Sequence, residues 1–473
     1  MSTLRPIGRC IRYFQGRRAV RRFASAATVP LSDPHPSIPD AGSHSRIPPE
    51  PTKVTHLASG ITVASIETYS PVSRLGLIVE AGSRFETEKN RGVTHFLRNS
   101  AFLSTSDYTA FRISRETEQL GGHLSATSTR DHFIYMGDCM RNDIGVMMEG
   151  ISSVALNSSF FPWEVSNQTA RVELDLKLAA ESPTIGIMES VHKGAFRTTL
   201  GNSLYCPTYN LGKITSDHLH QFVSDHYQPK RMVVIGIGVN SDEFVKTVQD
   251  TFSSAKSPEK VIDKLASQYH GGSEHRVETG SELVHACLAT EGVGLSSKDF
   301  LTSGLLQRIL GVTPFIKWSP NTISRVNKAG SEAVGGNPAM VTCFNTCHSD
   351  SGLFGLYVVS HADDVRKVLS AAVNEFSAVA KGNISDAELT RAKNQLKASI
   401  LMTHESQVEL LEDIGTQILV NGTYTDAHAA ADSVDKISGD DVVQVAKRFF
   451  GGKPTYAAQG NLCNTPYLDE LRS

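Results

Sequence analysis

The stretch Gly92-Val93-Thr94-His95-Phe96-Leu97-Arg98-Asn99-Ser100-Ala101-Phe102 decides how this chain folds and what chemistry it can carry. Its apolar residues recur at helical spacing and share one stripe: Val93, Phe96, Leu97 and Ala101. The stretch is therefore predicted to form a helix. His95 and Asn99 are one helical turn apart and share a second face with Phe102. These two polar side chains could therefore contact one ligand.

The pentapeptide His95-Phe96-Leu97-Arg98-Asn99 resembles the inverted zinc motif H-x-x-E-H of the pitrilysin-type (M16) peptidases. In an active member, two histidines one turn apart bind zinc, and the carboxylate between them is the general base for the zinc-bound water. In this chain Arg98 stands at the base position and Asn99 at the second histidine position. The resemblance implies a peptidase fold that has lost its catalytic chemistry.

The third zinc ligand of that family is a glutamate on a later helix, and the resemblance places Asp175 at its position. We located it by counting back from Met188–His192, which matches the next helix of the family. His95 is a good zinc ligand and Asp175 a possible one. Asn99, however, offers only a neutral amide oxygen, and Arg98 brings a permanent positive charge that cannot accept a proton from water.

We therefore predict no catalytic residue, no bound metal and no cofactor. His95, Arg98, Asn99 and Asp175 are interpreted as vestigial positions of the motif. The alternative interpretation is that the motif residues are ordinary helix residues, with His95 hydrogen-bonded in a pocket.

The composition is that of an ordinary globular protein. The chain has 473 residues, of which 40% are hydrophobic and 20% charged, and this length predicts two or three domains. A net charge of −3 gives no reason to expect nucleic acid as a partner. No apolar run is long enough to span a membrane, so we predict that membrane contact comes only through other proteins.

The seven cysteines contain no C-x-x-C pair. Their one cluster, Cys343-x-x-x-Cys347-His348, is interpreted as reduced core thiols rather than a metal site. Such cysteine usage is typical of a reducing compartment.

The first 32 residues contain seven arginines and no acidic residue. A cationic, amphipathic segment of this kind predicts a mitochondrial targeting peptide over residues 1–25, with processing near Ala24–Ala26. A Pro/Ser-rich arm over residues 26–52 would follow it. The alternative is a basic arm that binds membrane or nucleic acid, which the nearly neutral remainder of the chain disfavours.

The remainder of the chain contains an internal repeat at an offset of 223 residues, which relates Lys213–Asp217 to Lys436–Asp440. In each copy a Ser or Thr cap opens an amphipathic helix, and a short turn leads to a closing strand. Asp131–Leu156 and Ser351–Val379 share a second pattern, a strand followed by a helix. A repeat this long indicates duplicated domains rather than a solenoid.

The repeat and the resemblance together predict an α+β fold with two homologous pitrilysin-like (M16-type) domains. Each would be a mixed β-sheet covered by helices, and the pair would form a half-shell. We predict the N-terminal domain over residues 53–250, a linker over 251–276, and the C-terminal domain with its tail over 277–473.

Further segments are similar to the core subunits of the mitochondrial cytochrome bc1 complex, a non-catalytic branch of the M16 family. They are Ser70–Arg74, Asn202–Pro207, Ser349–Gly355 and Thr465–Leu471. The resemblance covers about residues 53–471 and implies a structural and assembly subunit of ubiquinol–cytochrome c reductase, respiratory-chain complex III. Such a subunit is peripheral on the matrix side of the inner membrane.

The implied partners are core protein 1, cytochrome b, cytochrome c1 and the Rieske iron–sulfur subunit, within a dimeric complex. No haem, iron–sulfur or quinone site is expected in this chain, because it has no C-x-x-C-H and no cysteine quartet.

Two other functions compete with this one. A non-catalytic, substrate-binding subunit of the mitochondrial processing peptidase would also lack the motif. It should carry a long glycine-rich loop, yet Gly311–Ala333 holds only two glycines.

Residual metalloendopeptidase activity would need the missing base. Active relatives also hold the peptide with an arginine and a tyrosine of the second domain. Arg325 is the nearest candidate, and no tyrosine follows it before Tyr357.

Overall fold

The structure is a computed structural model that describes residues 49–253, 255, 264–312, 324–335 and 337–471. The predicted targeting peptide, nearly all of the predicted arm and part of the predicted linker lie outside these residues. Residues 49–473 belong to one compact unit that contains two β-sheets.

The first sheet is formed by the N-terminal half of the chain. Its strands are β1 (Lys53–His56), β2 (Thr62–Ile66), β3 (Val72–Val79), β4 (His123–Ser128), β5 (Phe133–Met140) and β6 (Met232–Ile237). They lie in the order β1-β2-β6-β3-β5-β4, and β2 and β6 run parallel while the other neighbours are antiparallel.

The second sheet repeats this topology without the extra edge strand. Its strands are β7 (Glu274–Glu278), β8 (Leu283–Glu291), β9 (Ala339–Cys347), β10 (Gly352–His361) and β11 (Thr455–Gly460). The order is β7-β11-β8-β10-β9, again with one parallel pair, β7 and β11. β6 and β11 are the two closing strands, so the predicted duplication of an α+β domain is confirmed.

The helices also follow the repeat. In the first half they are α1 (Val93–Asn99), α2 (Ala110–Gln119), α3 (Ile144–Leu156), α4 (Pro162–Glu181), α5 (Pro183–Phe196), α6 (Ser216–His226) and α7 (Ser241–Thr251). In the second they are α8 (Phe300–Leu310), α9 (Arg325–Ala333), α10 (Val365–Ala380), α11 (Asp386–Thr403), α12 (Gln407–Asn421), α13 (Ala427–Asp435) and α14 (Gly439–Gly451). By chain order and length, α4 corresponds to α11, and α5 to α12.

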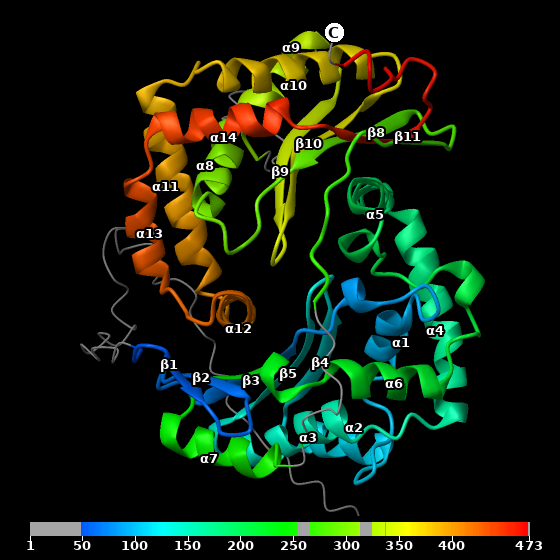
Figure 1. Ribbon diagram of the computed structural model, residues 1–473, viewed down its shortest axis with the longest axis vertical. Coiled ribbons are helices and arrows are strands. Elements are labelled where there is room, and N and C mark those ends of the chain that lie inside the picture. The colour runs from blue at the N-terminus through cyan, green and yellow to red at the C-terminus, as the bar shows by residue number, and fades with distance from the viewer. Residues whose placement is uncertain (1–48, 254, 256–263, 313–323, 336, 472–473) are drawn as a thin grey trace, which may run out of the picture. The chain divides into compact units, whose positions relative to one another are not determined.

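Each sheet has a main core on one face. Helices α1, α3, α6 and α7 pack on the first sheet, and α8, α10 and α14 on the second (Figure 1). Along β3, Leu75 and Leu77 enter the main core while Ile78 points to the opposite face, as the two-residue period of a strand requires. From Leu75 to Val79 no residue of β3 is polar, because both faces of the sheet are covered there.

The helix on that opposite face comes from the other half of the chain. Leu411, Ile414 and Ile418 of α12 pack on β3, β5 and β6 of the first sheet. A Cβ added at Gly76 of β3 would lie 2.6 Å from Leu411 Cδ2, so this glycine is needed for the close approach. The sequence did not predict this contact.

The second sheet receives a helix from the first half in return. Ile187, Val191 and Ala195 of α5 pack on β8, β10 and β11. The two halves therefore exchange one helix each, and neither sheet has both faces covered by its own half.

A buried ion cluster also connects the two halves. The side chain of Arg84 is only 1% exposed and contacts Asp131 of the first half at 2.6 Å and Asp350 of the second at 2.8 Å. Burial would raise the pKa of Asp131, but His348, His132 and Arg84 hold that pKa well below its usual range. The carboxylate is therefore ionised, as its partners require.

The exchanged helix gives a first prediction. Leu411→Ala should lower the free energy of unfolding by about 2–5 kcal/mol, because it removes a fully buried side chain over Gly76. Urea denaturation would measure the loss. Met402→Ala, at a side chain that is 65% exposed, is the matched control and should change stability by no more than about 0.5 kcal/mol. Equal stability of the two variants would contradict the exchange.

Candidate functional site

The residue before the helix that carries the degenerate motif must be glycine. Gly92 has φ 92°, and a Cβ there would lie 2.6 Å from Cys206 Sγ. Glu86 caps the helix, since its carboxylate accepts hydrogen bonds from the backbone N–H groups of Gly92 (2.8 Å) and Thr94 (2.9 Å). Burial raises the pKa of Glu86 to about 7, against the effect of these hydrogen bonds.

The predicted apolar stripe is confirmed. Val93, Phe96, Leu97 and Ala101 are at most 1% exposed. The helix itself is shorter than predicted, because α1 ends at Asn99 and the chain leaves it through Ser100.

The structure brings the four motif positions together on one oxygen atom. Asp175 Oδ2, on α4, lies 3.1 Å from His95 Nε2, 3.2 Å from Arg98 Nη2 and 3.2 Å from Asn99 Nδ2. The amide of Asn99 must present its nitrogen, because this nitrogen also donates to the backbone carbonyl of His95. Asp175 is thus the acceptor for three donors.

The hydrogen bonds also define the tautomer of His95. The backbone N–H of Cys206 donates to His95 Nδ1 at 3.1 Å, so Nδ1 carries no hydrogen. The hydrogen of the neutral ring is therefore on Nε2, which donates it to Asp175. Burial first, and then the charge of Arg98, lower the pKa of His95 and keep the ring neutral.

Asp175 is the negative partner in this arrangement. Partial burial would raise its pKa, but the hydrogen bonds from Asn99 and His95 and the charge of Arg98 lower it. One carboxylate and one guanidinium therefore balance each other at the contact between α1 and α4.

These residues do not fit a zinc ion. His95 Nε2 has a hydrogen where a metal would need a lone pair, and Asn99 presents N–H groups. Arg98 adds a fixed positive charge and cannot act as a base. Over the described ranges, no cluster of three or more His, Cys, Asp or Glu side chains is arranged to hold a metal ion. No hydrolytic step can be assigned to this site.

The candidate substrate-holding residues are engaged elsewhere. Arg325 pairs with Glu375 at 2.5 Å and donates to the backbone carbonyl of Asn383 at 2.7 Å. Tyr357 is buried beneath α5, where its hydroxyl contacts His285 and Thr184. Neither side chain is free to hold a peptide.

Cys343, Cys347 and His348 do not form a metal site within the described residues. Cys343 is buried in the core of the second half and is a free thiol. His348 instead contacts His192 of the first half, with 3.3 Å between the two Nε2 atoms.

Sequence reasoning missed Glu86 and Cys206, which position α1 and His95. Glu86 lies six residues before the N-cap residue Gly92, and the contact from Cys206 uses its backbone, which no side-chain pattern encodes. A cavity of about 630 Å³ lies next to these residues.

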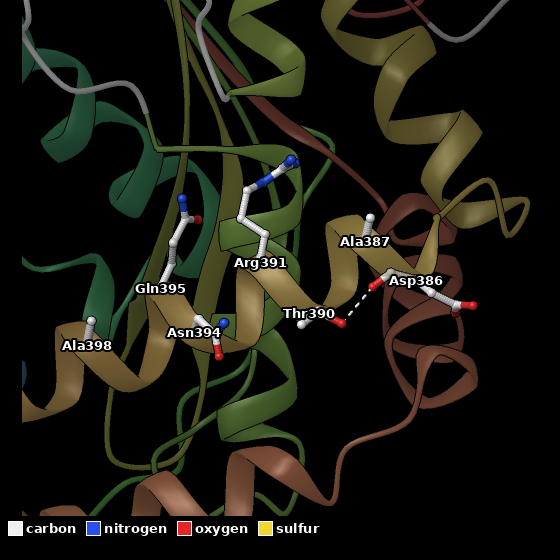
Figure 2. Close-up of a pocket in the computed structure, with 7 residues that line it drawn as sticks. All are labelled: Asp386, Ala387, Thr390, Arg391, Asn394, Gln395 and Ala398. Carbon is white, nitrogen blue, oxygen red and sulfur yellow. Dashed lines mark hydrogen bonds between the residues drawn. The ribbon is translucent and has the colours of Figure 1, made fainter.

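A larger open depression of about 750 Å³ lies over α11, as Figure 2 shows. All its lining residues come from that one helix: Asp386, Ala387, Thr390, Arg391, Asn394, Gln395 and Ala398. It is an exposed helix face and contains none of the motif positions.

The sequence of the chain matches known families and proteins over most of its length. Residues 62–208 match the family model "Insulinase (Peptidase family M16)", and residues 213–396 match "Peptidase M16 inactive domain". The chain is 38% identical to cytochrome b-c1 complex subunit 2, mitochondrial, of Homo sapiens, over 92% of this chain and 96% of that protein. Identity to the Mus musculus protein of the same name is 39%, over 89% and 92%. Identity to the mitochondrial-processing peptidase subunit alpha of Solanum tuberosum is 28%, over 97% and 96%.

The site predicts unequal roles for neighbouring residues of α1. Leu97→Ala removes a fully buried side chain and should cost about 2–5 kcal/mol of unfolding free energy. Arg98→Ala should cost about 1 kcal/mol or less, because both partners of its ion pair are partly exposed and Asp175 keeps two donors. Thermal melts would compare the two. A loss for Arg98→Ala as large as that for Leu97→Ala would show that the ion pair, not packing, holds the helix.

The hydrogen-bond donors around Asp175 also predict the metal content of the protein. The wild-type chain should bind no stoichiometric zinc in elemental analysis and cleave no presequence peptide. The double change Arg98→Glu with Asn99→His should give some zinc affinity in a competition titration. That affinity should stay weak, because His95 must first free Nε2 of its hydrogen, against the N–H of Cys206. One tightly held zinc per wild-type chain would contradict this account.

Proposed function

Because this chain belongs to the M16 peptidase family, in the branch of subunit 2 of the mitochondrial cytochrome b-c1 complex, we propose that it is a non-catalytic subunit of that complex. Its role in respiratory-chain complex III is structural and concerns assembly. The observation that carries the proposal is the contact of Arg98 and Asn99 with Asp175, which replaces a catalytic centre by a closed ion pair. The segment Thr465–Leu471 and the replacements at Arg98 and Asn99 resemble core protein 2 of that complex.

We further propose that His95, Arg98, Asn99 and Asp175 are the remains of a zinc site. Their convergence on one carboxylate oxygen supports this, since a helix turn and a second helix still meet as metal ligands would. Arg98 supplies the positive charge that the carboxylate would otherwise receive from a metal.

We propose as partners core protein 1, cytochrome b, cytochrome c1 and the Rieske subunit, with this chain on the matrix side of the inner membrane. None of the helices in the described ranges has the length and apolar character to cross a membrane. The outer stripe of α4 exposes Trp163, Leu174 and Leu178, which are 63%, 55% and 57% exposed. Large apolar side chains gathered on one helix face are typical of a chain that contacts other proteins.

The domain boundaries are proposed as residues 53–250 and 277–473, joined by 251–276 and preceded by a targeting peptide (1–25) and an arm (26–52). β6 pairs with β2 and β3, which supports a first domain that extends beyond residue 213, where the second family match begins.

The two alternative functions are less well supported. Identity to the processing peptidase subunit is 28%, against 38% to the complex III subunit over a similar share of the chain. The engagement of Arg325 with Glu375 argues against a peptide-holding role. Residual peptidase activity has no base, because Arg98 stands at its position.

Native gel electrophoresis of solubilised inner membranes, with mass spectrometry of the separated bands, tests the proposal. We expect the chain in the same band as cytochrome b and cytochrome c1. A chain found only in a soluble pair with an active M16 subunit would contradict the proposal and favour the processing peptidase.

A further inference from the structure

The cavity of about 630 Å³ beside the motif is separated from His95 by the loop that follows α5. Tyr205 packs edge-on against the His95 ring, with 5.5 Å between ring centroids, and it also lines the cavity. Helix α5 and the start of β7 form the other walls. The cavity is large enough for a small ligand.

The acidic side chains of this cavity are already engaged. Glu189 pairs with Arg130 at 2.6 Å, and Glu274 pairs with Arg276 at 3.1 Å. Glu86 caps α1, as described above. The carboxylates of the cavity therefore have few free acceptor positions for a cationic ligand.

Several basic and hydroxyl side chains that line the cavity, in contrast, are not engaged in the part of the chain that the structure describes. Lys193, Arg197 and His275 line it, and within the described residues none of them makes an ion pair or a side-chain hydrogen bond. Within the described residues, the hydroxyl groups of Tyr205 and Tyr209 likewise have no hydrogen-bond partner. The available groups are thus cations and donors, which suit an anion.

The backbone at Arg197 is held in a strained conformation. Arg197 has φ 61° and ψ −45°, and the N–H of Thr198 donates to the carbonyl of Phe196 at 2.7 Å. This is a γ-turn with positive φ, which is rare in proteins. Thr199 also has a positive φ, 53°. Such backbone positions are strained and concentrate at functional sites.

The surrounding contacts fix this turn against β7. Ser273 Oγ donates to the carbonyl of Gly194 at 2.9 Å, and the N–H of His270 donates to the carbonyl of Ala195 at 2.8 Å. The end of α5 is thereby tied to the strand that carries His275. Lys193, in the last turn of α5, and Arg197, directly after the helix, both line the cavity.

We propose that this cavity binds a phosphate-bearing anion. Arg197 would present its planar donors and Lys193 a point charge to the phosphate oxygens. His275 and the two tyrosine hydroxyls would complete the set of donors. The proposal is independent of the function in complex III, and the phosphate could belong to a soluble metabolite or to a phospholipid headgroup.

A purely structural role for the two cations predicts something different. Lys193 and Arg197 lie at the C-terminal end of α5, where positive charge balances the helix dipole. In that case their removal would lower the melting temperature, and no ligand would affect it.

The test uses the full mature chain and two probes. Isothermal titration with inorganic pyrophosphate reports a soluble ligand, and flotation with phosphatidylcholine vesicles, with and without cardiolipin, reports a headgroup. The double variant Lys193→Gln with Arg197→Gly should weaken binding of the effective probe by about tenfold or more. Glycine accepts the positive φ at residue 197, so the variant should fold.

Arg115→Ala with Lys246→Ala is the matched control, because it removes one exposed arginine and one exposed lysine on α2 and α7. It should bind like the wild type. Binding of pyrophosphate, or of cardiolipin vesicles only, with loss in the Lys193/Arg197 variant alone would support the proposal and identify the source. No binding of either probe, or equal binding by the Lys193/Arg197 variant and the control, would overturn it.

Discussion

The exchange of α5 and α12 between the two sheets is the constraint on which the rest of the structure depends. Each sheet has apolar residues on both faces, and within the described residues a helix from the other half packs on one of these faces. The burial of Arg84 between Asp131 and Asp350 adds a charged contact to the apolar ones. Separating the halves would expose two apolar surfaces and leave buried charges unpaired, which is costly. The two duplicated halves must therefore fold together as one unit.

Within this frame the position of the motif helix is fixed by contacts of the protein itself. Its apolar stripe is buried, its first turn is capped by Glu86, and its polar face meets Asp175 on α4. In an active peptidase a zinc ion would balance the carboxylate. Here Arg98 does so, and Asn99 and His95 complete the hydrogen bonds. Helices α1 and α4 thus remain in contact although Arg98 stands at the position of the catalytic base.

Much of this could be predicted from the sequence, because periodicity and caps are local signals. The stripe of α1, the strands β2, β3 and β6, and the capped helix α14 all follow from residue spacing. Asp175 could be located only through the resemblance, since nothing local marks it.

The missed features depend on contacts distant in the chain. β4 (His123–Ser128) has only two apolar residues, Leu124 and Ala126, and is defined by pairing with β5. The placement of α12 on the first sheet depends on Gly76, more than 300 residues away in sequence, and a buried helix face does not reveal its partner. The tautomer of His95 is determined by a backbone N–H, that of Cys206, which no motif contains.

This chain supports a respiratory complex without contributing chemistry. The most direct measurement is ubiquinol–cytochrome c reductase activity in membranes depleted of the chain and complemented with the wild type or with Asp175→Asn. This substitution keeps the shape of the side chain and an oxygen acceptor but removes the charge that a metal or a catalytic base would require. The account predicts equal amounts of assembled complex and equal activity per complex. Normal assembly with a loss of turnover or of presequence cleavage would contradict it.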